Sequence, residues 1–244
     1  MSRSMTQIAT KTSKQHHHKP LEFSFAAYAD HFDEHIRRSI RGYQDLISDC
    51  VALSTYFIEN ETTVVDIGCS AGSFVQMLQK HNCERAPRAK YIGIEVEREF
   101  AANWDNIENV EFVLSDIRDY DVPNDSSFIS SIFSLQFISE KERQAVLVDV
   151  FSSLVRGGAL ILAEKTLSPC AKLQDMLTSI HYDFKRSHFS DAEILEKERS
   201  LRSLMKLWTE EQITEALIRA GFSRTHIQCF WRSHNFVGFL ALRM

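Results

Sequence analysis

The chain is poor in the features that mark secreted, membrane-spanning and metal-binding proteins. Its cysteines number only five and are scattered without a C-x-x-C pair (Cys50, Cys69, Cys83, Cys170 and Cys229). We therefore expect no disulfide framework and no metal site. No apolar run approaches the roughly 20 residues that span a bilayer, and residues 1–20 lack the apolar core of a secretory signal. These absences favour a cytoplasmic location without a membrane partner.

The chain also lacks an excess of positive charge. It carries 28 basic and 33 acidic residues, for a formal net charge of -5. Without a basic surface to neutralise phosphates, direct binding to nucleic acid is not expected. The remaining composition, 44% hydrophobic and 25% charged, is ordinary for a globular protein. A length of 244 residues is enough for one large α/β domain with an insertion.

The distribution of apolar residues predicts a tail followed by one domain. Residues 1–20 are polar and include His16 to His18, and we interpret them as a disordered tail. The predicted domain covers residues 21–244. It opens with helices over 21–60, where apolar residues recur at three- to four-residue spacing. These helices either form a lid over a ligand site or cover one face of a sheet.

Strands and helix-length segments alternate from residue 62 onward. Seven strands are expected, at residues 64–67, 91–95, 110–114, 128–133, 159–164, 225–231 and 236–243. A helix over 142–154 is expected to end at Gly157-Gly158. Residues 166–208 are charged and helical in pattern, which predicts an insertion after the fifth strand. The fold class predicted is α/β, a Rossmann-like fold with a mostly parallel seven-stranded sheet and helices on both faces.

A small-residue turn follows the first strand at once. The strand carries Asp66, the turn reads Gly68-Cys69-Ser70, and a helix follows. Strand, glycine turn and helix open a nucleotide-binding unit, because glycine lets the backbone approach a ligand closely. A dinucleotide fingerprint would require glycine in place of Ser70. The degenerate turn is typical instead of class I methyltransferases that depend on S-adenosylmethionine (SAM), so the predicted α/β fold is of the class I methyltransferase type.

Polar residues also follow the next two predicted strands. Glu95 closes the second strand, where a carboxylate can accept hydrogen bonds from both ribose hydroxyls. Asp116 follows the third strand and is placed to accept the adenine amino group, with the backbone of Ile117 beside it. Ligands of open α/β sheets bind at the carboxyl ends of strands, so we expect SAM there. Cys69 is expected to pack as a small residue rather than act as a nucleophile.

Beyond the cofactor pattern, the chain resembles the carboxy-SAM synthases. These bacterial enzymes carboxylate SAM for modification of the wobble uridine of tRNA. The matching segments include Arg38 to Tyr43, Asp66 to Ser70, Asp116 to Asp119, Leu135 to Phe137, Glu142 to Ala145, Gly157 to Leu160, Glu164-Lys165, His181 to Arg186, Glu193-Ile194 and Gln228 to Phe230. The match at His181 to Arg186, in the predicted insertion, is the specific one, because ordinary methyltransferases diverge most there.

The resemblance implies a site, a reaction and an assembly. It implies that the cofactor, SAM or carboxy-SAM, contacts Tyr43, Asp66, Gly68, Cys69, Ser70, Glu95, Val96, Asp116 and Ile117. It implies prephenate as the carboxyl donor and a homodimeric enzyme. Arg199 in the insertion would pair with the carboxylate of the carboxylated cofactor, since a guanidinium offers two parallel donors.

The sequence departs from the family pattern at several positions. Ile132 stands where the family has an asparagine that contacts the cofactor, and Glu95 replaces an aspartate. The family's Lys-Arg pair reads Lys197-Glu198 here, and residues 231–236 keep only part of the family pattern. Two alternatives therefore stay open. One is a SAM-dependent methyltransferase acting on a small molecule, and the other is a SAM-binding protein without catalysis.

Overall fold

The computed structural model describes Phe25, Ala29 and residues 31–244. The predicted tail, residues 1–20 with His16 to His18, lies outside this part. The strands are β1 (Thr63–Ile67), β2 (Lys90–Glu95), β3 (Val110–Leu114), β4 (Ser126–Ile132), β5 (Leu154–Leu167), β6 (Trp208–Thr209), β7 (Ile227–Ser233) and β8 (Phe236–Leu242). The helices are α1 (Phe32–Ser39), α2 (Tyr43–Ser54), α3 (Ser73–Asn82), α4 (Glu140–Ser153), α5 (Ala171–Arg186), α6 (Asp191–Arg202) and α7 (Glu210–Ala220).

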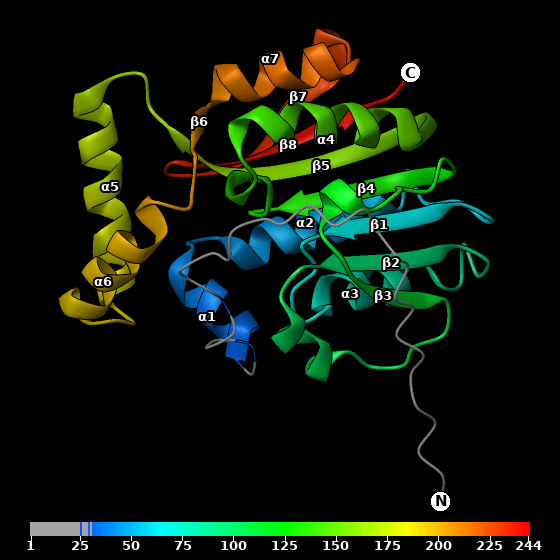
Figure 1. The fold of residues 1–244 in the computed structure, drawn as a ribbon, viewed down its shortest axis with the longest axis horizontal. Helices are drawn as coiled ribbons and strands as arrows, with labels where there is room; N and C mark the ends of the chain where they lie inside the picture. Colours follow the sequence, from blue (N-terminus) through cyan, green and yellow to red (C-terminus); the bar gives the residue numbers. More distant parts are fainter. Residues whose placement is uncertain (1–24, 26–28, 30) are drawn as a thin grey trace, which may run out of the picture.

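One twisted sheet forms the centre of the molecule (Figure 1). Its strand order is β3-β2-β1-β4-β5-β8-β7, and the short β6 pairs with β5 outside this path. β1 to β5 run parallel, whereas β8 is antiparallel to both β5 and β7. The mostly parallel sheet is confirmed. The order reverses on either side of β1, which creates the crevice at the carboxyl ends of the strands where such sheets bind ligands.

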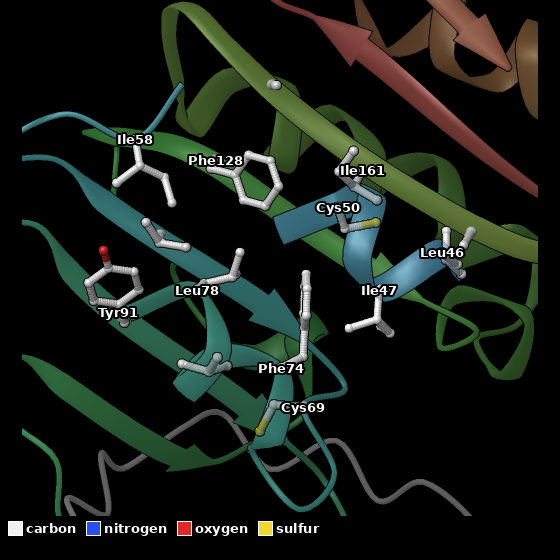
Figure 2. Packing of buried hydrophobic residues seen from close by; sticks show 14 of the residues in the cluster. Leu46, Ile47, Cys50, Ile58, Cys69, Phe74, Leu78, Tyr91, Phe128 and Ile161 are labelled. Atoms are coloured by element: carbon white, nitrogen blue, oxygen red, sulfur yellow. The ribbon is translucent and has the colours of Figure 1, made fainter. Parts of the chain in front are cut away.

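Helices cover both faces of the sheet, and each face has its own core. On one face, α2 and α3 pack against the strands through buried side chains such as Leu46, Phe74 and Phe128 (Figure 2). On the other face, α4 and α7 contribute residues such as Leu147 and Leu217. All of β1 is buried, as a parallel strand covered on both faces should be.

The end of α4 differs from the prediction. The helix stops at Ser153, and Gly157 and Gly158 lie inside β5 rather than at a helix end. Gly157 has φ +84° and donates its N–H to the Arg243 carbonyl at 2.6 Å. At Gly158, a Cβ would lie 3.0 Å from the Ser127 carbonyl oxygen of the neighbouring chain segment. These glycines therefore allow β5 to bend and pair closely, which the sequence pattern alone did not separate from a helix stop.

The sequence left open whether the N-terminal helices cover the sheet or lie over the ligand site, and the structure shows one helix in each position. Helix α2 covers the sheet, because Leu46, Ile47 and Cys50 are buried in the core that it shares with α3. Helix α1 has no buried residue of its own and lies over the carboxyl ends of the strands. Helices α5 and α6 follow β5 and stand beside the sheet (Figure 1). None of the helices in the described part of the chain has the length and apolar character needed to cross a membrane.

The core of the α2–α3 face generates a stability prediction. Phe128 is fully buried and stacks on Phe57, with 6.2 Å between ring centroids. Phe128→Ala should lower the free energy of unfolding by about 3–5 kcal/mol, since it leaves a cavity in a packed core. Tyr56→Ala, at a side chain 79% exposed, should change it by less than ~0.5 kcal/mol. Urea unfolding measures both, and equal small losses would contradict the packing described.

Candidate cofactor and substrate cavity

A cavity of about 330 Å³ lies at the carboxyl ends of β1, β2, β4 and β5. Helices α1, α2, α5 and α6 complete its walls. Most of the predicted cofactor residues line it, namely Tyr43, Asp66, Gly68, Cys69, Ser70, Glu95 and Val96. Asp116 and Ile117 do not line it, and neither does Arg199. The structure therefore brings together the residues of the glycine turn and of β2, but not the remaining candidates.

The turn after β1 brings the backbone to the cavity wall. Gly68 has φ +78°, and a Cβ there would lie 2.1 Å from the Ser134 hydroxyl oxygen. Ser70 also has a positive φ, +49°, at the position where a dinucleotide fingerprint would have glycine. The N–H groups of Gly68 and Cys69 donate to the Ile94 carbonyl at 2.8 and 3.0 Å. These bonds fix the turn against the end of β2.

The Glu95 carboxylate strengthens the same junction. Its Oε2 accepts the Ser70 N–H at 2.9 Å, and its Oε1 accepts those of Val96 and Glu97 at 2.8 and 2.9 Å. Burial raises the pKa of this carboxyl, and the three backbone donors oppose the rise. Each carboxylate oxygen can accept more than one hydrogen bond. Oε1 already accepts two N–H groups and Oε2 accepts one, so the capacity left for a ligand hydroxyl lies on Oε2.

Two buried groups beside the turn have unusual protonation behaviour. Asp66 accepts the Ser130 hydroxyl at 2.7 Å, and burial raises the pKa of its carboxyl to about 7. A cation bound beside Asp66 would favour its ionised form. The Cys69 thiol is also buried, which raises its pKa, and its sulfur lies where a Cβ on Gly93 would collide at 2.8 Å. Both observations agree with a packing role for Cys69.

Asp116 is engaged elsewhere. Its carboxylate accepts the Arg118 backbone N–H at 2.9 Å and pairs with the Arg118 guanidinium at 2.6 Å. Arg118 also bonds Glu142 on α4 at 2.6 Å. Asp116 therefore caps the short 3-10 turn Ile117–Asp119, a local bond that competes with contacts to a ligand. A contact of Asp116 with the adenine amino group would have to compete with these bonds.

Arg199 is also placed away from the cavity. Its side chain is 77% exposed and pairs with Glu196 at 3.7 Å on the same helix. Lys197 and Glu198 line the cavity instead. Two residues along an α-helix correspond to a rotation of about 200°, so Lys197 and Arg199 face opposite directions. Within one chain, the Arg199 side chain therefore points away from the cavity in which the cofactor is expected.

Three lysines to which the sequence analysis gave no role reach the cavity, and we call them the lysine group: Lys165 on β5, Lys185 on α5 and Lys197 on α6. Glu198 pairs with Lys165 at 3.3 Å. Burial lowers the pKa of Lys185, and burial together with the Lys185 charge lowers that of Lys197 to about 7. Lys197 also hydrogen-bonds His35 on α1. The position of Lys165 near the carboxyl end of β5 could have indicated from the sequence that it reaches the ligand site.

Acidic side chains line the cavity from other elements, and we call them the acid group: Asp33 on α1, Asp66 on β1, Glu95 on β2 and Glu97 after it. Asp33 accepts the Ser73 hydroxyl at 2.5 Å, which ties α1 to the start of α3. β4 lies between β1 and β5 in the sheet, so the strand-borne acids and Lys165 enter from opposite sides of β4. In the described part of the chain, no three His, Cys, Asp or Glu side chains gather to hold a metal ion.

Comparison with known proteins identifies the family. The profile of the FtsJ-like methyltransferase family matches residues 51–199. A carboxy-S-adenosyl-L-methionine synthase of Salmonella paratyphi C is 33% identical over 223 residues, which cover 88% of each chain. The chain belongs to the carboxy-SAM synthase family. A synthase of Staphylococcus epidermidis, 29% identical over 235 residues, aligns with 93% of this chain and 99% of its own. This member is a SAM-dependent transferase, and SAM is its cofactor.

Solved structures agree on the fold. A SAM-dependent methyltransferase of Aquifex aeolicus matches 91% of this chain and all of its own, with a TM-score of 0.58 and 16% identity. Human N-acetylserotonin methyltransferase, solved with SAM, matches 92% of this chain and 60% of its own, with a TM-score of 0.56 and 15% identity. The class I methyltransferase fold predicted for this carboxy-SAM synthase family member is confirmed.

The Glu95 geometry predicts a loss of cofactor affinity. Glu95→Ala removes the acceptor of the Ser70 N–H and any acceptor for ribose hydroxyls. SAM should then bind at least about tenfold more weakly, because hydrogen bonds to a charged group contribute about 1.5–3 kcal/mol. Isothermal titration calorimetry measures this, with exposed Glu108→Ala as the matched control. Unchanged affinity in the Glu95 variant would remove Glu95 from the cofactor site.

Proposed function

We propose that the protein converts SAM and prephenate to carboxy-SAM and phenylpyruvate. The observation that carries this proposal is the shared cavity, where the acid group faces the space from one set of elements and the lysine group from another. SAM carries a sulfonium cation, and prephenate carries two carboxylates. Opposite charges attract strongly where water is scarce. A cavity with acids and lysines on separate walls suits this pair of ligands.

The acid group and the glycine turn would hold SAM. In this proposal Glu95 accepts the ribose hydroxyls, and the backbone at Gly68 approaches the methionine part of the cofactor. Val96 is 58% exposed at the cavity and would pack against the adenine ring. Tyr43 and Asp66 would lie toward the sulfonium end. The adenine amino group would find its partner elsewhere than on Asp116.

The reaction balances without a nucleophile from the protein. Prephenate breaks its bonds to one carboxyl group and to its ring hydroxyl, releasing carbon dioxide and hydroxide and leaving phenylpyruvate. The hydroxide takes a proton from the SAM methyl group and becomes water. The sulfonium ylide that remains forms a carbon–carbon bond to the carbon dioxide. The protein would orient both substrates and exclude water, which agrees with the burial of the Cys69 thiol.

One observation supports a second candidate. Ile132 lines the cavity at the position where the family has an asparagine, and an aliphatic side chain makes no hydrogen bond to a cofactor. A site that holds SAM with one polar contact fewer is compatible with methyl transfer to a small molecule. The lysine group favours an anionic acceptor in that case as well.

The assembly and the fate of the product follow the family resemblance. We propose a homodimer, and the exposed side chains of Leu173, Met176 and Ile180 along α5 offer an apolar surface for it. Light scattering of the purified protein tests this, and a monomeric mass at micromolar concentration would contradict it. The product would serve modification of the tRNA wobble uridine in the cytoplasm. With a net charge of -5, the chain itself would not contact the tRNA.

The proposed reaction has a direct test. The purified protein is incubated with SAM and prephenate labelled with carbon-13 in the ring carboxylate, and products are followed by mass spectrometry. The label should appear in carboxy-SAM, with phenylpyruvate formed in equal amount. Glu95→Ala protein serves as the control and should lose this activity at limiting SAM. S-adenosylhomocysteine formed with a small-molecule acceptor, and no carboxy-SAM, would reject the proposal in favour of methyl transfer.

A further inference from the structure

Lys165 and Lys185 lie together in the cavity wall, where the charge of Glu198 acts on both. Lys165 is paired with Glu198, and both side chains are largely buried, at 12% and 17% exposed. Lys185 is also buried, and the charges of Lys165 and Glu198 act on it in opposite directions. Lys197 adds a further amine to the same wall. A buried ammonium group such as that of Lys185 is costly to desolvate, and an anion bound beside it offsets that cost.

A buried imidazole lies in the same wall. His181 lies one helical turn before Lys185 on α5, lines the cavity and is only 4% exposed. Among the described residues its Nδ1 has no hydrogen-bond partner, and its ring packs on Phe236 at 5.1 Å between centroids. Burial and the nearby Lys165 and Lys185 lower the pKa of His181 to about 3. The ring is therefore neutral and can present one N–H donor to an acceptor in the cavity.

We propose that Lys185 and His181 on α5, with Lys165 on β5, form the subsite that binds a carboxylate of the anionic co-substrate. This inference rests on the proposed function for the identity of that substrate. The spacing of His181 and Lys185 places both side chains on one face of the helix. Lys165 enters from the end of a neighbouring strand. Three donors thus converge on the cavity from two elements.

The subsite would supply the carboxylate donors that the sequence analysis expected from Arg199. Glu198, next to Arg199 on α6, lines the cavity, and its carboxylate is bonded to Lys165. Arg199 is turned to solvent. Glu198 forms its ion pair with Lys165, and we assign the Lys185 ammonium group to the ligand carboxylate. Ammonium and imidazole donors from α5 replace one guanidinium from α6, so selection of the co-substrate depends on α5 in this chain.

The test measures binding without turnover. Prephenate is titrated by calorimetry into the full chain loaded with S-adenosylhomocysteine. Lys185→Gln should weaken prephenate binding by about tenfold or more, since it removes a charged donor, and Lys185→Arg should retain most of the affinity. His181→Phe keeps the packing on Phe236 and should also weaken prephenate. Lys172→Gln, an exposed lysine on the same helix, and Arg199→Ala should each stay within about twofold of the parent.

Affinity for SAM separates a local loss from a damaged fold. All variants should bind SAM within about twofold of the parent protein. Unchanged prephenate binding in Lys185→Gln, a loss in Arg199→Ala instead, or no prephenate binding by the parent protein would each overturn the subsite. If the parent binds prephenate through Lys185 but forms no carboxy-SAM, the subsite stands and the proposed reaction fails. The two claims are thereby distinguished.

Discussion

The Glu95 carboxylate joins the ends of two neighbouring strands. It accepts the N–H of Ser70 from the turn after β1 and those of Val96 and Glu97 from its own strand end. The turn is bonded to β2 a second time through the Ile94 carbonyl. A non-glycine residue with positive φ, such as Ser70, is costly without such support. These bonds therefore fix the part of the cavity wall formed by Gly68, Ser70 and Glu95, which we call the floor. The positions of the remaining cavity walls are set relative to that floor.

The order of the strands gives the cavity one acidic wall and one basic wall. β1 and β2 end in acids, β5 carries Lys165, and β4 separates them. After β4, Phe133 has φ +59°, an uncommon conformation for an aromatic residue and one that clusters at functional sites. Helices α5 and α6 then bring the other lysines to the wall that Lys165 begins. The fold thus provides a place for a cation and a place for an anion in one cavity.

Sequence reasoning succeeded where the chemistry is local. The turn at Gly68 and the acid at Glu95 were predictable, because a strand, a turn and a strand end fix their positions. The directions of the Asp116 and Arg199 side chains were not predictable. That of Asp116 depends on its bond to Arg118, and that of Arg199 depends on its position around helix α6. Lys185 could not be found from spacing, because its partners come from segments far apart in the chain. The resemblance singled out the segment from His181 to Arg186, but it assigned the carboxylate contact to Arg199.

A crystal structure of the protein with S-adenosylhomocysteine and prephenate tests the central claim most directly. The account predicts the ribose hydroxyls on Glu95 and a prephenate carboxylate within hydrogen-bond distance of Lys185 Nζ and His181 Nδ1. The cofactor sulfur should lie between these two contacts. A carboxylate bound to Arg199, or a cofactor ribose that does not touch Glu95, would contradict a cavity that binds its two ligands at oppositely charged walls.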